Sequence, residues 1–191
     1  MNHKTLVISL LISAVMLSIS GTAMSDDDYE RGGFLNRWFG DSKPGVAPVE
    51  NPYYLEECGS CHFAYQPGLL PARSWSKLMA GLDDHFGENA ELPAEDAKIL
   101  EDYLVGNSAD KSNHKRSKKI MKRMPSTDTP LRITETRYFI KKHDELSRNM
   151  VQGNPQVESI SRCDSCHKQA AKGSFEEDEI EIPGFGRWED D

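Results

Sequence analysis

The chain has 191 residues and a formal net charge of −8 at pH 7, from 31 acidic and 23 basic side chains. This acidic balance argues against a nucleic-acid partner. Only 37% of the residues are hydrophobic, so the length fits one domain, or two small ones, with a thin apolar core.

The first 25 residues have the pattern of a secretory signal peptide. Lys4 gives a short positive region, residues 6–19 are apolar or small, and further small residues lead up to cleavage positions after Ala23 or Ser25. Fourteen such residues are few for a bilayer span, so a retained transmembrane anchor is the weaker alternative. The mature protein is expected to be exported, soluble and without stable membrane insertion.

All four cysteines lie in two copies of one pattern, Cys-x-x-Cys-His, at Cys58–His62 and Cys163–His167. This pattern is typical of c-type haem attachment, because two thiols at that spacing form thioethers to one haem and the adjacent imidazole meets its iron. The sequence therefore predicts two covalently bound haem c groups. The predicted attachment residues are Cys58, Cys61, Cys163 and Cys166, with His62 and His167 as iron ligands.

Two other uses of paired cysteines compete with this interpretation. A structural zinc site could take four thiolates, but zinc ribbons separate their pairs by about 15–20 residues, whereas residues 62–162 separate these pairs by 101. A redox disulfide would not require a histidine after both pairs. Haem attachment is favoured over both.

The segment after the first motif predicts a loop and then a helix that carries a second ligand. The loop is expected to place a carbonyl against the second nitrogen of His62. Ser74 is the expected N-cap of a helix over residues 75–86, with Gly87 at its end. His85 shares the apolar face of this helix, and we predict it as the distal ligand of the first haem.

A further amphipathic helix is expected from Pro93 to Gly106, and its apolar stripe is Ile99, Leu100, Tyr103 and Leu104. Residues 26–57 are rich in glycine and proline and predict a largely irregular arm. Residues 111–123 carry a basic cluster. It could dock an acidic redox partner, offset the charge of the haem propionates, or be a solvated linker between the domains.

The second half has its own candidate for a distal ligand, although no internal repeat appears beyond the two Cys-x-x-Cys-His motifs. Thr134 is the expected cap of a helix on which Phe139, His143 and Met150 share one stripe, so His143 is the predicted distal ligand of the second haem. Methionine is the alternative sixth ligand, and its candidates are Met79, Met124 and Met150.

The second motif is expected within a helix over residues 159–172 that Gly173 closes, followed by an exposed acidic tail. The predicted fold class is mainly α, with two small haem-binding helical domains, irregular arms and a linker. The expected boundaries are 1–25 for the signal peptide, 26–110 for the first domain, 111–130 for a basic linker and 131–191 for the second domain.

Several longer runs, in this order, resemble the bacterial dihaem cytochrome c family, often called DHC. They are Glu57–Tyr65, Leu69–Trp75, His85–Gly87, Pro130–Thr136 and Lys142–Glu145. The resemblance implies a periplasmic electron carrier whose first domain is like a class I cytochrome c. It also implies that two histidines hold each iron, and the four ligands would be His62, His85, His143 and His167. Family members are associated with membrane b-type cytochromes and with the small haem protein SHP, which makes these the expected partners.

Two histidines per iron leave no position for substrate, so the sequence favours single-electron transfer and not an enzyme. The alternative is a small dihaem peroxidase, or a protein that reacts with oxygen or nitrogen oxides at one open iron. A haem-based sensor would need a signalling domain that the sequence lacks. Chain order pairs His62 with His85 and His143 with His167, but crossed ligation would use the same four residues.

Overall fold

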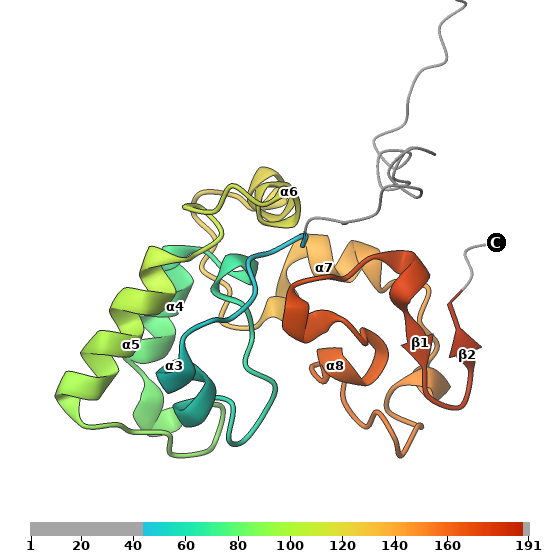
Figure 1. Cartoon of the computed structure of the whole chain (residues 1–191), viewed down its shortest axis with the longest axis horizontal. Helices are drawn as coiled ribbons and strands as arrows, with labels where there is room; N and C mark the ends of the chain where they lie inside the picture. The colour runs from blue at the N-terminus through green and yellow to red at the C-terminus, as the bar shows by residue number, and fades with distance from the viewer. Residues whose placement is uncertain (1–43, 189–191) are drawn as a thin grey trace, which may run out of the picture. The chain divides into compact units, whose positions relative to one another are not determined.

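Helices make up most of the regular structure in the computed structural model, which describes residues 44–188 (Figure 1). All the described residues belong to one compact unit. The α-helices are α3 (Pro52–Glu57), α4 (Ala72–Met79), α5 (Ala94–Gly106), α6 (Lys115–Arg123), α7 (Arg137–Lys142) and α8 (Cys163–Cys166). The mainly helical fold class is confirmed.

Short 3₁₀ turns and one small antiparallel sheet complete the described chain. The turns are η2 (Pro67–Leu69), η3 (Leu82–Asp84), η4 (Ile133–Glu135), η5 (Arg148–Met150), η6 (Ala170–Lys172) and η7 (Glu177–Glu179). The strands are β1 (Glu181–Ile182) and β2 (Gly186–Arg187). The signal peptide and residues 26–43 lie outside the described residues, and the two-domain boundaries stay a prediction.

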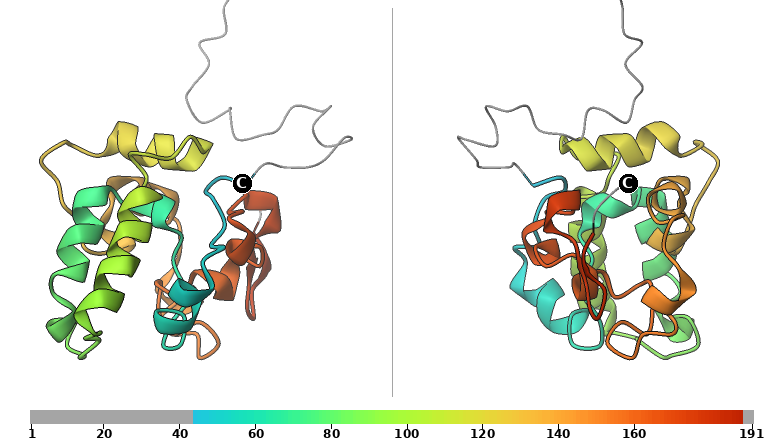
Figure 2. Two further views of the ribbon diagram at one scale, coloured as in Figure 1. Left: turned by 60° about the vertical axis from the view of Figure 1, so that its left-hand side comes forward. Right: turned by 90° about the vertical axis from the view of Figure 1, so that its right-hand side faces the viewer.

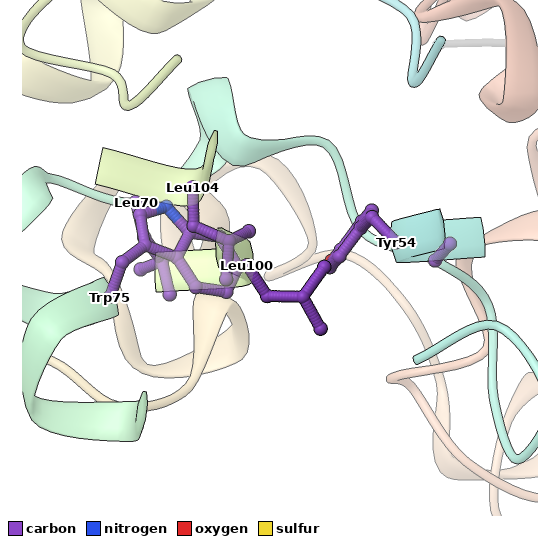
Figure 3. Packing of buried hydrophobic residues seen from close by; sticks show 6 residues of the cluster. Tyr54, Leu70, Trp75, Leu100 and Leu104 are labelled. Carbon is purple, nitrogen blue, oxygen red and sulfur yellow. The ribbon is translucent and has the colours of Figure 1, made fainter. Parts of the chain in front are cut away.

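The first hydrophobic cluster lies where α4 and α5 pack side by side (Figures 1 and 2). Leu100 and Leu104 are one helical turn apart and fully buried, and they meet Trp75 of α4 (Figure 3). The Trp75 indole donates a hydrogen bond to the Pro67 carbonyl at 2.8 Å, so its polar atom is satisfied inside the core. Ile99, predicted on the same stripe, is 49% exposed.

The second cluster is built from residues far apart in the sequence. Val46, Leu69, Ile120 and Tyr138 are buried together, which brings α6 against η2 and α7. The Ser117 hydroxyl donates to the Gly68 carbonyl at 2.8 Å. Residues 115–123 were predicted as part of a basic linker, but they form a helix with a buried face.

The helix predicted over residues 75–86 is shorter and begins earlier. Pro71 is the N-cap of α4, Ser74 lies inside the helix, and the helix ends at Met79. Gly81, which has φ −129° and ψ 35°, interrupts the helical backbone. His85 therefore does not lie on a helix face; it follows the separate turn η3.

The second half also differs in its helix boundaries. Thr136, not Thr134, caps α7, and its hydroxyl accepts a hydrogen bond from the Phe139 amide. The helix ends at Lys142, so His143 is its C-cap. The helix predicted over residues 159–172 is replaced by α8 and η6, but Gly173 closes η6 in the left-handed conformation, as expected.

The acidic tail is folded rather than simply exposed. Glu176 contacts Arg116 of α6 at 3.3 Å, and Glu177 contacts Lys142 of α7 at 3.2 Å. The backbone of Ile180 pairs with that of His167. The tail thereby packs beside the second Cys-x-x-Cys-His motif.

We expect Gly173→Ala to destabilise the protein more than Gly87→Ala. Both glycines have positive φ, +77° and +100°, and the left-handed backbone alone costs an alanine about 1–2 kcal/mol. At Gly173 a Cβ would also lie 2.2 Å from the Val46 carbonyl oxygen, whereas at Gly87 nothing lies within 4 Å. Denaturant unfolding of the holoprotein measures both losses; equal losses would contradict the close approach at Gly173.

Candidate haem sites

His62 and His85 form the first pair of histidines. His62 ends the first motif, shortly after α3, and its Nδ1 lies 2.8 Å from the Phe63 carbonyl oxygen. Because a carbonyl only accepts, Nδ1 carries the proton and Nε2 keeps its lone pair for a metal. The prediction of a carbonyl at this nitrogen is confirmed.

A tight turn positions His85. The His85 amide donates to the Glu88 carbonyl at 2.7 Å, Phe86 and Gly87 both have positive φ, and the Asp84 carboxylate accepts from the Gly87 amide at 3.0 Å. The His62 and His85 rings are 6.2 Å apart between centroids, with 18° between their planes.

His143 and His167 form the second pair, with ring centroids 6.1 Å apart and 71° between their planes. The His143 Nδ1 donates to the Phe139 carbonyl at 2.9 Å, and the Phe139 ring stacks on it at 3.8 Å. The His167 Nδ1 is buried and has no hydrogen-bond partner among the described residues. Burial, then His143 and Arg116, lower the pKa of His167 to about 4.

Both separations fit two imidazoles on opposite sides of one metal. With a metal–nitrogen distance of about 2 Å on each side, the two ring centroids lie about 6 Å apart. The structure brings together His62 with His85 and His143 with His167, which is the pairing that chain order suggests. Within residues 44–188, no three His, Cys, Asp or Glu side chains are grouped to hold a metal by themselves.

The four cysteines are unpaired and flank the histidines in both motifs. Cys58 is the C-cap of α3, and Cys163 and Cys166 are the first and last residues of α8. Burial raises the pKa of the Cys58 thiol to about 11 and that of Cys163 to about 12. Burial thus favours the neutral thiol over the thiolate at both positions, unlike the electropositive surroundings that activate a reactive cysteine.

Two of the three methionines that could be a sixth iron ligand pack against the hydrophobic clusters. Met79 packs against the first hydrophobic cluster and Met124 against the second. Met150 ends η5. The packing accounts for Met79 and Met124 as core residues.

A pocket of about 580 Å³ opens beside His85, between α4 and the segment before η4. Leu78, Leu131 and Arg132 are among its lining residues, and the Arg132 guanidinium lies 3.8 Å over the Phe86 ring. Its volume is in the range typical of cofactor sites.

Sequence reasoning missed Arg116, which the structure places beside the second pair. Its side chain is 10% exposed and donates to the Tyr138 hydroxyl at 2.8 Å and the Phe175 carbonyl at 3.0 Å. The Phe175 ring in turn lies 5.2 Å from that of His167. In the sequence, Arg116 is hidden among basic residues that are mostly exposed.

Comparison with known proteins identifies the family of the chain. Residues 54–175 match the family described as dihaem cytochrome c. The chain belongs to this family. The haem-attachment pattern and the two histidine pairs all lie within the matched region.

Solved structures of diheme cytochromes c are similar to this chain. One from Shewanella baltica OS155 is 44% identical, with a TM-score of 0.61, and the match covers 74% of this chain and 99% of that one. One from Rhodobacter sphaeroides is also 44% identical, with a TM-score of 0.61, and covers 68% of this chain and all of its own. No curated protein matches significantly.

As a dihaem cytochrome c, the chain carries two covalently attached haem c groups. This assignment confirms the cofactor predicted from the two Cys-x-x-Cys-His motifs. Among the described residues, no helix is long and apolar enough to cross a bilayer.

Hydrogen bonds from two side chains connect the first haem site to the second. The Tyr65 ring packs on His62 at 5.1 Å, and its hydroxyl donates to the Ser161 carbonyl, just before the second motif, at 2.8 Å. Gln66 is fully buried and donates to the Ala170 carbonyl at 2.5 Å. These contacts hold the two motifs in a fixed relation.

We expect Tyr65→Phe to lower the free energy of unfolding by about 1 kcal/mol, the usual cost of one lost hydrogen bond. Haem content and visible spectrum should not change, because the ring that packs on His62 remains. Tyr54→Phe, which loses the bond to the Tyr65 carbonyl at 2.8 Å, is the matched comparison within the first half. Unchanged stability of Tyr65→Phe in denaturant titration would show that the bridge contributes nothing.

Proposed function

We propose that this protein is a periplasmic electron carrier in which two histidines ligate each haem iron. His62 and His85 would hold the first iron, and His143 and His167 the second. The observation that carries this proposal is the separation of 6.2 Å and 6.1 Å between the paired rings, which suits one metal between each pair.

When bound, each haem supplies a one-electron ferric–ferrous couple. The chain's own residues fix the state of the ligands. The Phe63 and Phe139 carbonyls accept from the Nδ1 atoms of His62 and His143, which sets the tautomer of each ring and raises its basicity. If His62 with His85 and His143 with His167 hold the two irons, no position would remain for a substrate at either one.

The fixed relation between the two sites supports transfer within the chain. Tyr65 and Gln66 join the segment after the first motif to residues beside the second. A rigid arrangement keeps the cost of reorganisation low when an electron arrives or leaves. The protein's role is thus to place the two couples and to set their potentials.

The alternative is an enzyme with one open iron. The first haem site is the better candidate for that open iron. His143 has a carbonyl partner and a stacked phenyl ring. His85 is held by its turn and lies beside the 580 Å³ pocket. Displacement of His85 would be the step that such an enzyme requires.

We infer the location from the predicted signal peptide and the partners from the family resemblance. Export to the periplasm would allow exchange of electrons with a membrane b-type cytochrome and with a small SHP-like haem protein. Fractionation of cells that express the full chain tests the location: we expect the haem protein in the periplasmic fraction, shortened by cleavage after Ala23 or Ser25.

The function is tested by separating electron exchange from catalysis. Fully reduced protein mixed with ferricyanide should release two electrons per chain rapidly and reversibly. The same protein given hydrogen peroxide should show no sustained peroxide consumption. Steady turnover of peroxide would favour the enzyme and remove the carrier proposal.

A further inference from the structure

The two haem sites differ in the charge beside them. Arg116 near the second pair is 10% exposed, whereas Arg132 near the first pair is 48% exposed. A charge out of water is screened far less than one at the surface. The second site therefore has a buried cation beside it, whereas the cation beside the first site is half exposed to water.

Several contacts fix Arg116 in this position. Its backbone amide donates to the Gly45 carbonyl at 2.9 Å, and its guanidinium donates to Tyr138, to the Phe175 carbonyl and to Glu176. Its Nε is buried without an acceptor among the described residues. The guanidinium also lies 5.8 Å from the centre of the Phe175 ring.

The charge of Arg116 reaches both histidines of the second pair. The Phe175 ring that its guanidinium contacts lies 5.2 Å from the ring of His167, and the rings of His167 and His143 are 6.1 Å apart. The Glu176 carboxylate offsets it in part at 3.3 Å, but that side chain is 25% exposed. A cation near an iron favours the ferrous form, which carries one positive charge fewer than the ferric form, and so raises the reduction potential.

Resting on the proposed function, we propose that Arg116 makes the second haem the one of higher potential, so that electrons entering the protein collect there. An electron that arrives at the haem beside His62 and His85 would then move to the haem beside His143 and His167. Arg116 is a positioning and tuning residue: it touches the surroundings of the second site and does not ligate iron.

The ring planes offer a way to follow each haem separately. The planes of the first pair are 18° apart and those of the second pair 71° apart. Nearly parallel imidazoles split the two iron orbitals to which they donate, whereas nearly perpendicular ones leave them close in energy. Two low-spin EPR signals are therefore expected, with the larger g anisotropy from the second haem, and the signal altered in His143→Ala confirms that assignment.

The test is a redox titration of the holoprotein followed by EPR. As the potential of the wild-type protein is lowered, we expect the ferric EPR signal of the second haem to disappear first. Arg116→Gln should shift the electron distribution about tenfold toward the first haem, which is the order of magnitude for removing one poorly screened unit charge near a redox centre. A tenfold shift is about 59 mV for a one-electron couple. Arg132→Gln should shift the first haem much less, because that charge is exposed.

Two further variants separate charge from structure. Arg116→Lys keeps the charge and should keep most of the potential difference. Glu176→Gln removes the counter-charge and should raise the potential of the second haem, opposite to Arg116→Gln. Equal potentials of the two haems in the wild type would overturn the role assigned to Arg116. Shifts of the same sign in Arg116→Gln and Glu176→Gln would also overturn it. In either case, two low-spin EPR signals would still support the electron-carrier function.

Discussion

Replacement of His143 by alanine should convert the second haem from low-spin to high-spin and allow its reduced iron to bind carbon monoxide. The ring lies 6.1 Å from that of His167, and its Nδ1 donates to Phe139, so Nε2 is the nitrogen left for iron. Without it, the sixth position is open. Optical spectra of the reduced variant should show carbon monoxide bound to one haem per chain.

His85→Ala should have the same effect at the first haem and leave the second closed. His114→Ala is the matched control. That residue is the N-cap of α6, its ring lies 3.3 Å from the Ser112 hydroxyl, and it belongs to neither pair. If His143→Ala stayed low-spin and refused carbon monoxide, another side chain, such as Met124 or Met150, would have to be the sixth ligand.

Replacement of Cys58 and Cys61 together by alanine should leave one covalent haem per chain instead of two. Thioether bonds keep haem attached after denaturation, whereas axial histidines alone do not. The mass of the denatured variant should equal the chain plus one haem, and its haem content should be half that of the wild type. Cys163 with Cys166 should behave in the same way at the other site.

Stability should fall together with haem content. Within residues 44–188, the side chains provide a thin core that consists of two small clusters of buried hydrophobic residues. Ser60→Ala and Ser165→Ala, inside the same motifs, are controls that leave both thiols in place. Two haems retained after denaturation in the double cysteine variants would contradict covalent attachment through these residues.

The attachment residues could be predicted from the sequence because the chemistry is local. Cys58, Cys61 and His62 lie within five positions, and their spacing alone specifies one haem. The same holds for the second motif. Such short-range constraints do not depend on how the rest of the chain folds.

The structure brings His85 beside His62 and His143 beside His167, as chain order suggests, but the local structure predicted for both distal histidines was wrong. Helical periodicity placed His85 and His143 on apolar helix faces, but α4 ends at Met79 and α7 at Lys142. Gly81 and the turn at Phe86–Gly87 decide where His85 lies. The end of a helix depends on such breaks and on packing, which the spacing of apolar residues does not reveal.

Arg116 could not have been singled out from the sequence. Its partners, Tyr138, Phe175 and Glu176, are 22, 59 and 60 positions away. A run of lysines and arginines ordinarily indicates a solvated segment, and most of this one is exposed. Only the tertiary fold shows that one member is buried against the acidic tail, which was itself expected to be exposed.

The most direct test of two-histidine ligation is the optical and EPR spectrum of the purified holoprotein, oxidised and reduced, with and without carbon monoxide. We predict two low-spin haems, no methionine–iron charge-transfer band and no carbon monoxide binding. A high-spin component that binds carbon monoxide would contradict the account, because it would show an open iron where His85 or His143 should be bound.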